Sequence, residues 1–289
     1  MMEKSTSITI IGLGAVGSAL LKFFEENGFV IRSVWDSRSG KILKDSKPDP
    51  VIKNHSFPQT ENETGELVFI TTPDDEISKV AEKLALQSIN WEERSVIHCS
   101  GNLTSAELES LKNRGAQTAS MHPIQTFKRG DGKDRFDQIY ISLEGDNELC
   151  SRLEKLVKLM NAKQVRLNRE QKRTLHIAAV FSSNYLVALL HLVENYLNKQ
   201  SLDDGLNLLE PLISQTITNI FEKGTVQSLT GPISRGDFES VQKHLQSLKT
   251  DNNLADLYKI LGREALNIAI KRENISESNV LQLREVLKD

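Results

Sequence analysis

The strongest constraint on the fold of this chain is a glycine-rich turn between a strand and a helix. The run SITIIG is continuously apolar, as buried strands are, and AVGSALLKFFEENG has the periodicity of an amphipathic helix. Between them, the spacing G-x-G-x-x-G lets backbone N–H groups approach a pyrophosphate at a helix N-terminus. A plain strand-to-helix turn could have the same pattern, but the strand and helix around it favour a dinucleotide site. The residues expected to bind the cofactor are Gly12, Leu13, Gly14, Ala15, Val16 and Gly17.

Strands and helices continue to alternate through the first half of the chain. Apolar runs such as ELVFITTP, SVIHCSG and QIYISLEGD alternate with helical runs such as DDEISKVAEKLAL. After Arg169 the β signal disappears, and helical periodicity extends through 170–198, 202–222, 237–248, 251–272 and a last stretch near 277–287. We therefore predict an α/β Rossmann domain over residues 1–168, with a doubly wound parallel sheet, and an all-helical domain over residues 169–289.

Composition excludes several classes of partner. The 289 residues carry a net charge of -3 with acids and bases interspersed, which disfavours nucleic acid and anionic membranes as partners. Cys99 and Cys150 have neither metal-binding nor redox spacing, so we expect two buried thiols and no metal. The first residues show no charged segment followed by an apolar run and a cleavage site, and we expect a cytoplasmic protein.

Residues at the end of the second strand carry conflicting signals about the cofactor. Asp36 lies 19 residues beyond Gly17, close to where an acid would hold the ribose hydroxyls of NAD. Ser37 and Arg38 follow directly, and an arginine there can receive the 2′-phosphate of NADP. We favour NADP over NAD, because loop geometry can turn Asp36 away; a solvated turn is the alternative for each residue.

Other candidate residues follow later strands, where ligands of open α/β sheets bind. Thr72 and Pro73 end one strand and are expected beside the nicotinamide. Ser100 and Gly101 end the next and are candidates for binding a substrate carboxylate or carbonyl. His122 precedes a proline and is held in extended backbone, so it is a third substrate-binding candidate. A structural hydrogen-bonding role is the alternative for this histidine.

The stretch LHIAAVFSSNYLVALLHLV is apolar but contains a polar stripe. On an ideal helix Lys172, His176, Ser183 and Asn184 fall within about 120° of one another, with His191 on the same side. We expect a helix that is buried nearly all round, with this stripe facing the nicotinamide cleft. A core helix that satisfies neighbouring loops is the alternative; a membrane span would need other spans to satisfy the stripe, and no second comparable span exists.

Several motifs together resemble one protein family. GLGAVGSAL, TTPDDEI, HCSGNL, MHPIQTF, HIAAVFSSNYLVALL, PLISQTITNI and LTGPISRGD look like the Rossmann-like proteins that carry the DUF2520 domain. These are relatives of ketopantoate reductases, pyrroline-5-carboxylate reductases and the 6-phosphogluconate dehydrogenase superfamily. The resemblance implies a C-terminal domain like that of 6-phosphogluconate dehydrogenase, and dimerisation through it.

The resemblance also implies roles for residues on the long helix. The superfamily uses a lysine and an asparagine one helical turn apart, as general acid and substrate-orienting group. Here Lys172 begins the helix, but Asn184 is too distant in sequence for that spacing, and His176 follows Lys172 by one turn. His176 is therefore our first choice for the general acid and Lys172 the second, with Asn184 orienting the substrate. By the same resemblance Arg235, in LTGPISRGD, is expected to hold a substrate carboxylate.

These expectations combine into a functional hypothesis. We expect an oxidoreductase that uses NADP or NAD to reduce the carbonyl of a small carboxylate, with ketopantoate the first substrate to try. The alternatives are an imine reductase of the pyrroline-5-carboxylate type and a non-catalytic nicotinamide sensor. A homodimer joined by the helical domain is the expected assembly.

Overall fold

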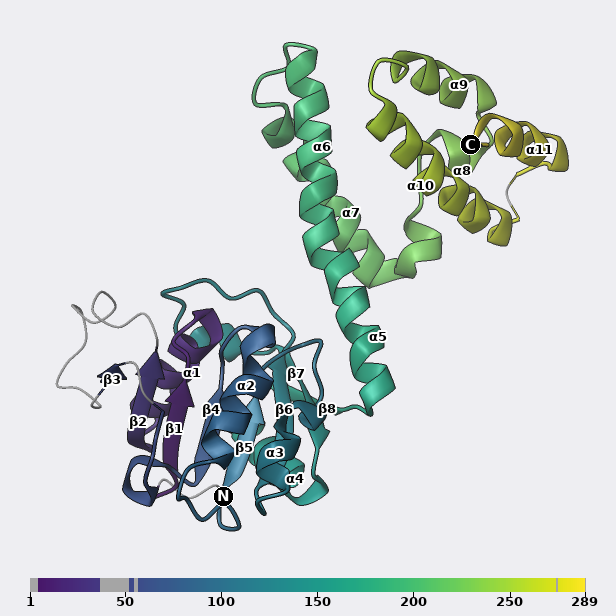
Figure 1. Ribbon diagram of the computed structural model, residues 1–289. Helices are drawn as coiled ribbons and strands as arrows, with labels where there is room; N and C mark the ends of the chain where they lie inside the picture. Colours follow the sequence, from purple (N-terminus) through teal and green to yellow (C-terminus); the bar gives the residue numbers. More distant parts are fainter. Residues whose placement is uncertain (1–4, 37–51, 55–56, 274, 289) are drawn as a thin grey trace. The chain divides into compact units, whose positions relative to one another are not determined.

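The computed structural model describes residues 5–36, 52–54, 57–273 and 275–288 of the chain (Figure 1). The chain divides into two compact units, Met1–Ser183 and Asn184–Asp289. The first unit therefore extends past the predicted boundary at residue 168 and includes helix α5 (Arg169–Ala179). This helix is tied to the sheet because Lys172 donates hydrogen bonds to Ser100 and Ser120.

A single twisted sheet forms the centre of the first unit (Figure 1). In the described residues its eight strands lie in the order β3-β2-β1-β4-β5-β6-β7-β8. Continuous apolar runs such as LVFI form strands that are buried on both faces, as parallel strands between helical layers are. The strands are β1 (Ser7–Ile11), β2 (Val30–Asp36), β3 (Ile52–Asn54), β4 (Leu67–Ile70), β5 (Ser95–His98), β6 (Gln117–Pro123), β7 (Tyr140–Gly145) and β8 (Lys163–Arg166).

Helices cover both faces of this sheet, as the sequence predicted. One hydrophobic cluster joins the sheet to α1 (Ala15–Glu26) and α4 (Asn147–Leu159), and a second joins it to α2 (Asp74–Ala85) and α3 (Glu109–Lys112). Successive side chains of a strand point to opposite faces of the sheet, so Phe69 of β4 lies in the first cluster and Ile70 in the second. Short 3-10 turns complete the unit at η1 (Glu61–Glu63), η2 (Ser105–Leu108) and η3 (Lys133–Phe136).

The sheet is not parallel throughout, which corrects one expectation. Strand β7 runs antiparallel to β6 and parallel to β8, whereas the other neighbours are parallel. Parallel neighbours need a long crossover that usually contains a helix. The segment between β6 and β7 contains only the single turn η3, so the chain reverses direction instead.

The second unit is entirely helical in its described residues. Its hydrophobic cluster is built from four helices around Leu266 and Leu283: α8 (Pro232–Arg235), α9 (Phe238–Ser247), α10 (Asn252–Lys271) and α11 (Glu277–Val286). Two longer helices precede them, α6 (Tyr185–Lys199) and α7 (Gly205–Ser228). Helix α7 is interrupted at Gly224, whose φ of 79° lies outside the helical region, so the expected end near residue 222 coincides with a break.

The expectation that the long apolar helix is buried nearly all round is wrong for the chain by itself. The helical segment 169–199 is long and apolar enough to cross a membrane, yet no residue of its apolar window is buried. Helices in soluble assemblies and in membranes both meet this test of length and composition. A π-helical turn, η4 (Val180–Asn184), also interrupts the segment. The extra residue in such a turn changes the angular register, so side chains beyond it leave the stripe drawn on an ideal helix.

Candidate functional site

The glycine turn after β1 has the close backbone contacts that its sequence predicts. Gly12 has a φ of 101°, and a Cβ atom there would lie 2.9 Å from the backbone of Thr71 and Thr72 after β4. A Cβ atom on Gly17 would collide with the carbonyl oxygen of Gly12, so this glycine lets α1 pack closely against the turn. The turn is therefore built for glycine at both positions.

The same turn leaves polar groups for a ligand. Helix α1 has Gly14 as its N-cap, which supplies no side-chain hydrogen bond to the first backbone N–H groups. A Cβ on Gly14 would meet only the carbonyl oxygen of Thr71, at 3.7 Å. The hydroxyl of Thr72 is buried without a hydrogen-bond partner. Since β1 lies between β2 and β4, where the strand order changes direction, these features fit the pyrophosphate of a dinucleotide.

Asp36 is turned towards the glycine loop. It is the last residue of β2, is buried, and its Oδ2 accepts a hydrogen bond of 2.7 Å from the backbone N–H of Leu13. Asp36 is the residue predicted to bind the ribose, and one of its two carboxylate oxygens is therefore already hydrogen-bonded to the glycine turn. Ser37 and Arg38, the residues that favoured NADP, lie outside the described residues.

A hydrogen-bonded loop after β5 lies next along the same edge. Pro73 is the N-cap of α2, and the following residue, Asp74, accepts a hydrogen bond of 2.9 Å from the hydroxyl of Ser100. That hydroxyl also accepts bonds from the backbone N–H groups of Asn102 and Leu103. Ser100 therefore supports its own loop, and the substrate contact predicted for it stays a prediction.

His98 holds the other side of this loop. Its Nδ1 accepts a bond from the N–H of Ser100 at 3.2 Å, so the proton lies on Nε2, which donates to the carbonyl of Thr104 at 3.0 Å. Burial, and after it the charge of Lys172, lower the pKa of His98 to about 4. This imidazole is a neutral structural group.

Two other imidazoles converge on Gly101. The position of a Cβ atom on this glycine lies 2.8 Å from Nε2 of His122 and 2.9 Å from Nδ1 of His176. Only a residue without a side chain allows both rings to approach so closely. We call His122 and His176 the imidazole pair. Burial, then the charges of Lys172 and His176, lower the pKa of His122 to about 4.

Lys172 is the buried cation of the site. It is 2 % exposed, and its Nζ donates to the carbonyl of Ser100 and to Oγ of Ser120, each at 2.7 Å. Burial lowers the pKa of this ammonium to about 8, although the carboxylates of Glu144 and Asp74 oppose the shift. The group is thus desolvated and held by two hydrogen bonds.

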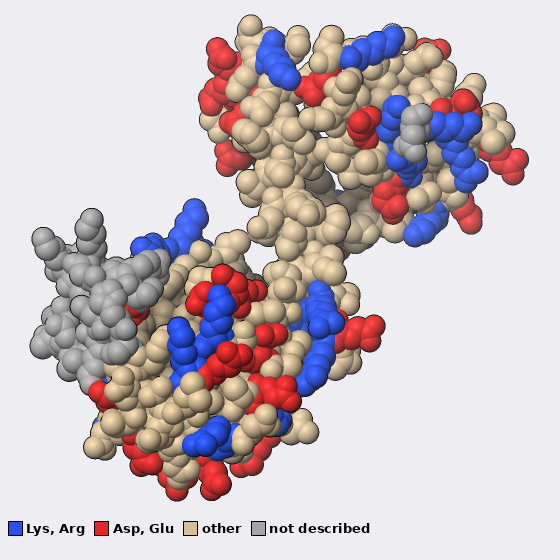
Figure 2. Space-filling view, in the orientation of Figure 1, with Lys and Arg blue, Asp and Glu red and all other residues tan. Residues whose placement is uncertain are grey.

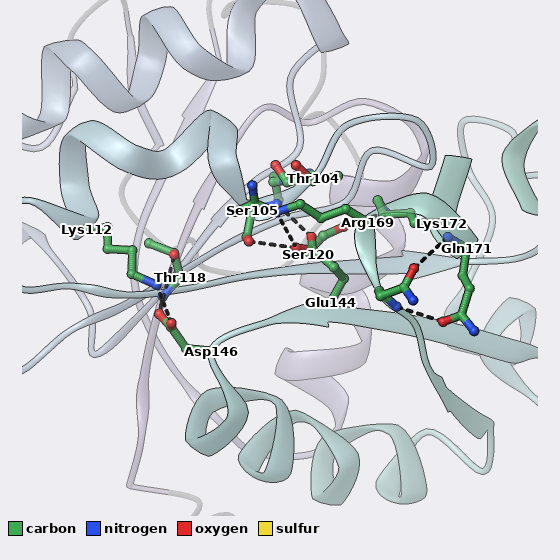
Figure 3. Close-up of polar contacts among 12 residues, drawn as sticks. Thr104, Ser105, Lys112, Thr118, Ser120, Glu144, Asp146, Arg169, Gln171 and Lys172 are labelled. Atoms are coloured by element: carbon green, nitrogen blue, oxygen red, sulfur yellow. Dashed lines mark hydrogen bonds and ion pairs between the residues drawn. The ribbon is translucent and has the colours of Figure 1, made fainter. Parts of the chain in front are cut away.

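A carboxylate and a helix cap, both absent from the sequence prediction, support Lys172. Glu144 on β7 accepts bonds from the N–H and the hydroxyl of Ser105, and Arg169 lies 3.8 Å from it (Figure 3). At the start of α5, Asn168 and Gln171 form a reciprocal capping box that holds the turn carrying Lys172. The one sequence signal for Glu144 was that it is the only charged residue of the largely buried strand YISLEG.

The remaining predicted residues lie in the second unit. Asn184 is exposed at the end of η4, and Arg235 is exposed at the end of α8. The loop before Arg235 is fixed by Arg272, which donates to the carbonyl of Leu229 at 2.7 Å and to Ser234. The structure therefore gathers Ser100, Lys172 and the imidazole pair within one unit, whereas the substrate contacts of Asn184 and Arg235 stay predictions.

Comparison with known proteins supports the two-part organisation. Residues 1–123 match the Rossmann-like domain family, and residues 139–265 match the domain of unknown function DUF2520. No functionally curated protein matches the chain by sequence.

Solved structures share the fold over most of the chain. A candidate NADP oxidoreductase from Bacteroides fragilis is 22% identical with a TM-score of 0.74, covering 91% of this chain and 99% of that one. A Thermotoga maritima protein is 25% identical with a TM-score of 0.69, covering 92% and 99%. An imine reductase from Myxococcus stipitatus, solved with NADP+, is 15% identical with a TM-score of 0.57, covering 90% and 94%. The chain thus combines a Rossmann-like domain with a DUF2520 domain, as its sequence motifs predicted.

Proposed function

We propose that this chain is an NADPH-dependent cytoplasmic reductase that acts on the carbonyl or imine carbon of a small carboxylate. One observation carries the proposal: contacts run without a break along one edge of the sheet. The glycine turn packs against Thr72, Asp74 binds the Ser100 hydroxyl, and the adjoining Gly101 meets the imidazole pair. A cradle for a dinucleotide and a set of proton-carrying groups are therefore joined within the first unit.

The residues of the turn fit a nicotinamide cofactor, which supplies the hydride when it is bound. The backbone of the turn and the hydroxyl of Thr72 would hold it, with Pro73 stiffening the adjoining loop. The preference for NADPH over NADH rests on the sequence, in which Ser37 and Arg38 directly follow Asp36. The names of two relatives in fold, an NADP oxidoreductase and an imine reductase solved with NADP+, support the same preference.

The substrate needs a proton as well as a hydride. His176 is half-buried against Gly101, and an imidazole N–H at that position would protonate the oxygen or nitrogen as it becomes negatively charged. Asn184 would orient the carbonyl, and Arg235 would bind the carboxylate. Ketopantoate represents the oxo acids in this proposal, and a cyclic imine carboxylate represents the second substrate class.

The first experiment separates cofactor binding from catalysis. NADPH and NADH are titrated while the fluorescence of Trp35 and Trp91 is followed, and turnover is then measured with both substrate classes. In His176→Ala we expect kcat to fall about 100-fold or more with the Kd for NADPH unchanged. His244→Ala, on α9 of the second unit, is the matched control.

Each outcome has a distinct meaning. Failure of both cofactors to bind would refute the proposal. Binding without turnover of either substrate class would favour a nicotinamide sensor, and unchanged turnover in His176→Ala would remove that residue from the chemistry.

We also propose that two copies of the chain associate through α6 and α7. Neither helix carries a buried side chain, and the hydrophobic cluster of the second unit is built from α8 to α11. Leu208, Leu212 and Phe221 of α7 are exposed, and the middle of this helix pair shows almost no charge in the visible view (Figure 2). An apolar helix pair of this kind needs a covering surface.

Light scattering tests this association. The wild-type chain is expected at twice its monomer mass, and Leu212→Glu at the monomer mass, because a buried unpaired carboxylate opposes association. Leu86→Glu, at a still more exposed leucine of the first unit, is the control and should stay dimeric. A wild-type monomer in plain buffer would contradict the proposal, and partition of the chain into detergent or lipid would point to a membrane instead.

A further inference from the structure

Because the proposed proton transfer is assigned to His176, Lys172, the buried cation of the site, is left without a role in that proposal. Two of its three N–H groups are committed, one to the carbonyl of Ser100 and one to the hydroxyl of Ser120. Both acceptors are themselves buried. A group held in this way is placed to fix its neighbours.

The neighbours that Lys172 holds are the residues beside the imidazole pair. Ser100 directly precedes Gly101, on which both rings converge. Ser120 lies two residues before His122 on β6, so the two side chains leave the same face of the strand. Lys172 and His176 lie four residues apart on α5 and share a face of that helix. One ammonium therefore connects all three elements that form the pair's environment.

The charged groups around the imidazole pair also oppose a positive charge on His122. The carboxylates near Lys172 are Asp74 on α2 and Glu144 on β7, with Arg169 at the start of α5 opposite Glu144. His98, on β5, is a neutral hydrogen-bonding group, and burial raises the pKa of the Cys99 thiol to about 12. Within this surrounding the ammonium opposes a positive charge on His122, consistent with the low pKa of that imidazole.

We propose that Lys172 is a positioning residue, which holds Ser100 and Ser120 around Gly101 and opposes a positive charge on His122. The link between this role of Lys172 and catalysis rests on the proposed reductase function. For each hydride added to the substrate carbon, the pair gives up one proton to the oxygen or nitrogen and then regains it from solvent. Lys172 keeps its own protons and its two hydrogen bonds throughout.

Histidine NMR tests the inference without cofactor or substrate. The ring Cε1–H signals are followed against pH in the wild-type chain and in Lys172→Gln, which keeps a hydrogen-bond donor but loses the charge. His122→Gln and His176→Gln assign the signals. We expect His122 to stay neutral until the pH approaches about 4 in the wild type, and its midpoint to rise by about one pH unit in Lys172→Gln.

Three further variants make the result decisive. Lys172→Arg keeps the positive charge and should keep His122 neutral, Lys155→Met removes an exposed charge and should change nothing, and Lys172→Met repeats the test if the glutamine variant is unfolded by circular dichroism. An unchanged His122 midpoint in the uncharged variants, or a positively charged His122 ring in the wild type at pH 6, would overturn the inference. If the midpoint shifts although no nicotinamide cofactor binds, the proposed function fails while the role of Lys172 stands.

Discussion

The Rossmann unit and the α6–α7 helix pair differ in how far their apolar side chains are buried within the chain. In the Rossmann unit, two clusters cover both faces of the sheet, and residues such as Phe69 are fully buried. In the helix pair, side chains just as apolar remain in solvent, with Phe221 87 % exposed. Both regions come from strongly hydrophobic sequence.

This difference shows that an apolar sequence predicts that a segment is buried, but not which surface covers it. The strands of the first unit are covered by helices of the same chain that precede or follow them. Helices α6 and α7 contact each other, but two helices cannot enclose apolar residues on every side. The fold of one chain buries the apolar side chains of the first region, and the proposed association would cover those of the second.

Truncating a buried phenylalanine is expected to have the largest effect. Phe69→Ala removes a ring that contacts Phe24 in the first cluster and should lower the free energy of unfolding by about 3–5 kcal/mol. Denaturant unfolding at two protein concentrations measures the loss, which should be the same at both because the cavity lies within one chain. A loss that depends on concentration would break the comparison.

Acid should weaken the first unit through its buried imidazoles. His98 and His122 have pKa values of about 4 in the folded chain and about 6.5 when unfolded, so between these pH values the unfolded chain binds more protons. The free energy of unfolding should therefore fall as the pH drops from 6.5 to 4, by about 3 kcal/mol for each histidine at most. Unfolding measured at several pH values checks this, and His98→Gln should flatten the slope. A flat profile for the wild type would contradict the neutral, buried state of both rings.

Truncating an exposed phenylalanine should act through association alone. Phe221→Ala is expected to weaken the dimer by about 2 kcal/mol and to leave the monomer fold unchanged, because this side chain is exposed within its own chain. Sedimentation equilibrium and thermal unfolding at increasing protein concentration measure the effect. A loss of stability independent of concentration would place Phe221 in an intrachain core instead.

The smallest effect concerns the helix that joins the two regions in sequence. Asn168→Ala removes one half of the α5 capping box and should cost about 1 kcal/mol of stability in the first unit. Because this turn carries Lys172, hydrogen exchange of the Ser100–Ser105 loop should also increase. Faster exchange confined to α6 and α7 would show that α5 belongs energetically with the second unit.

Local patterns were sufficient to predict much of the fold and one half of the site. The glycine turn, the alternation of strands and helices, and the change to helices after Arg169 all depend on residues near one another in sequence. Ser100, His122, Lys172 and His176 were each identified from strand ends or helix periodicity. Their meeting around Gly101 was not predictable, because it joins segments from three distant parts of the chain.

By itself, the sequence determined the class of fold and the position of the dinucleotide turn, since backbone sterics and hydrophobic periodicity act over a few residues. Only the tertiary structure decided that α5 belongs to the first unit, that Asp36 binds Leu13, and that Ser100 supports a loop. It also showed that Lys172 is a buried donor and that a π turn, which ends at the exposed Asn184, interrupts the helix carrying the polar stripe. The physical reason is that burial and hydrogen-bond partners come from packing between distant segments, which no local pattern encodes.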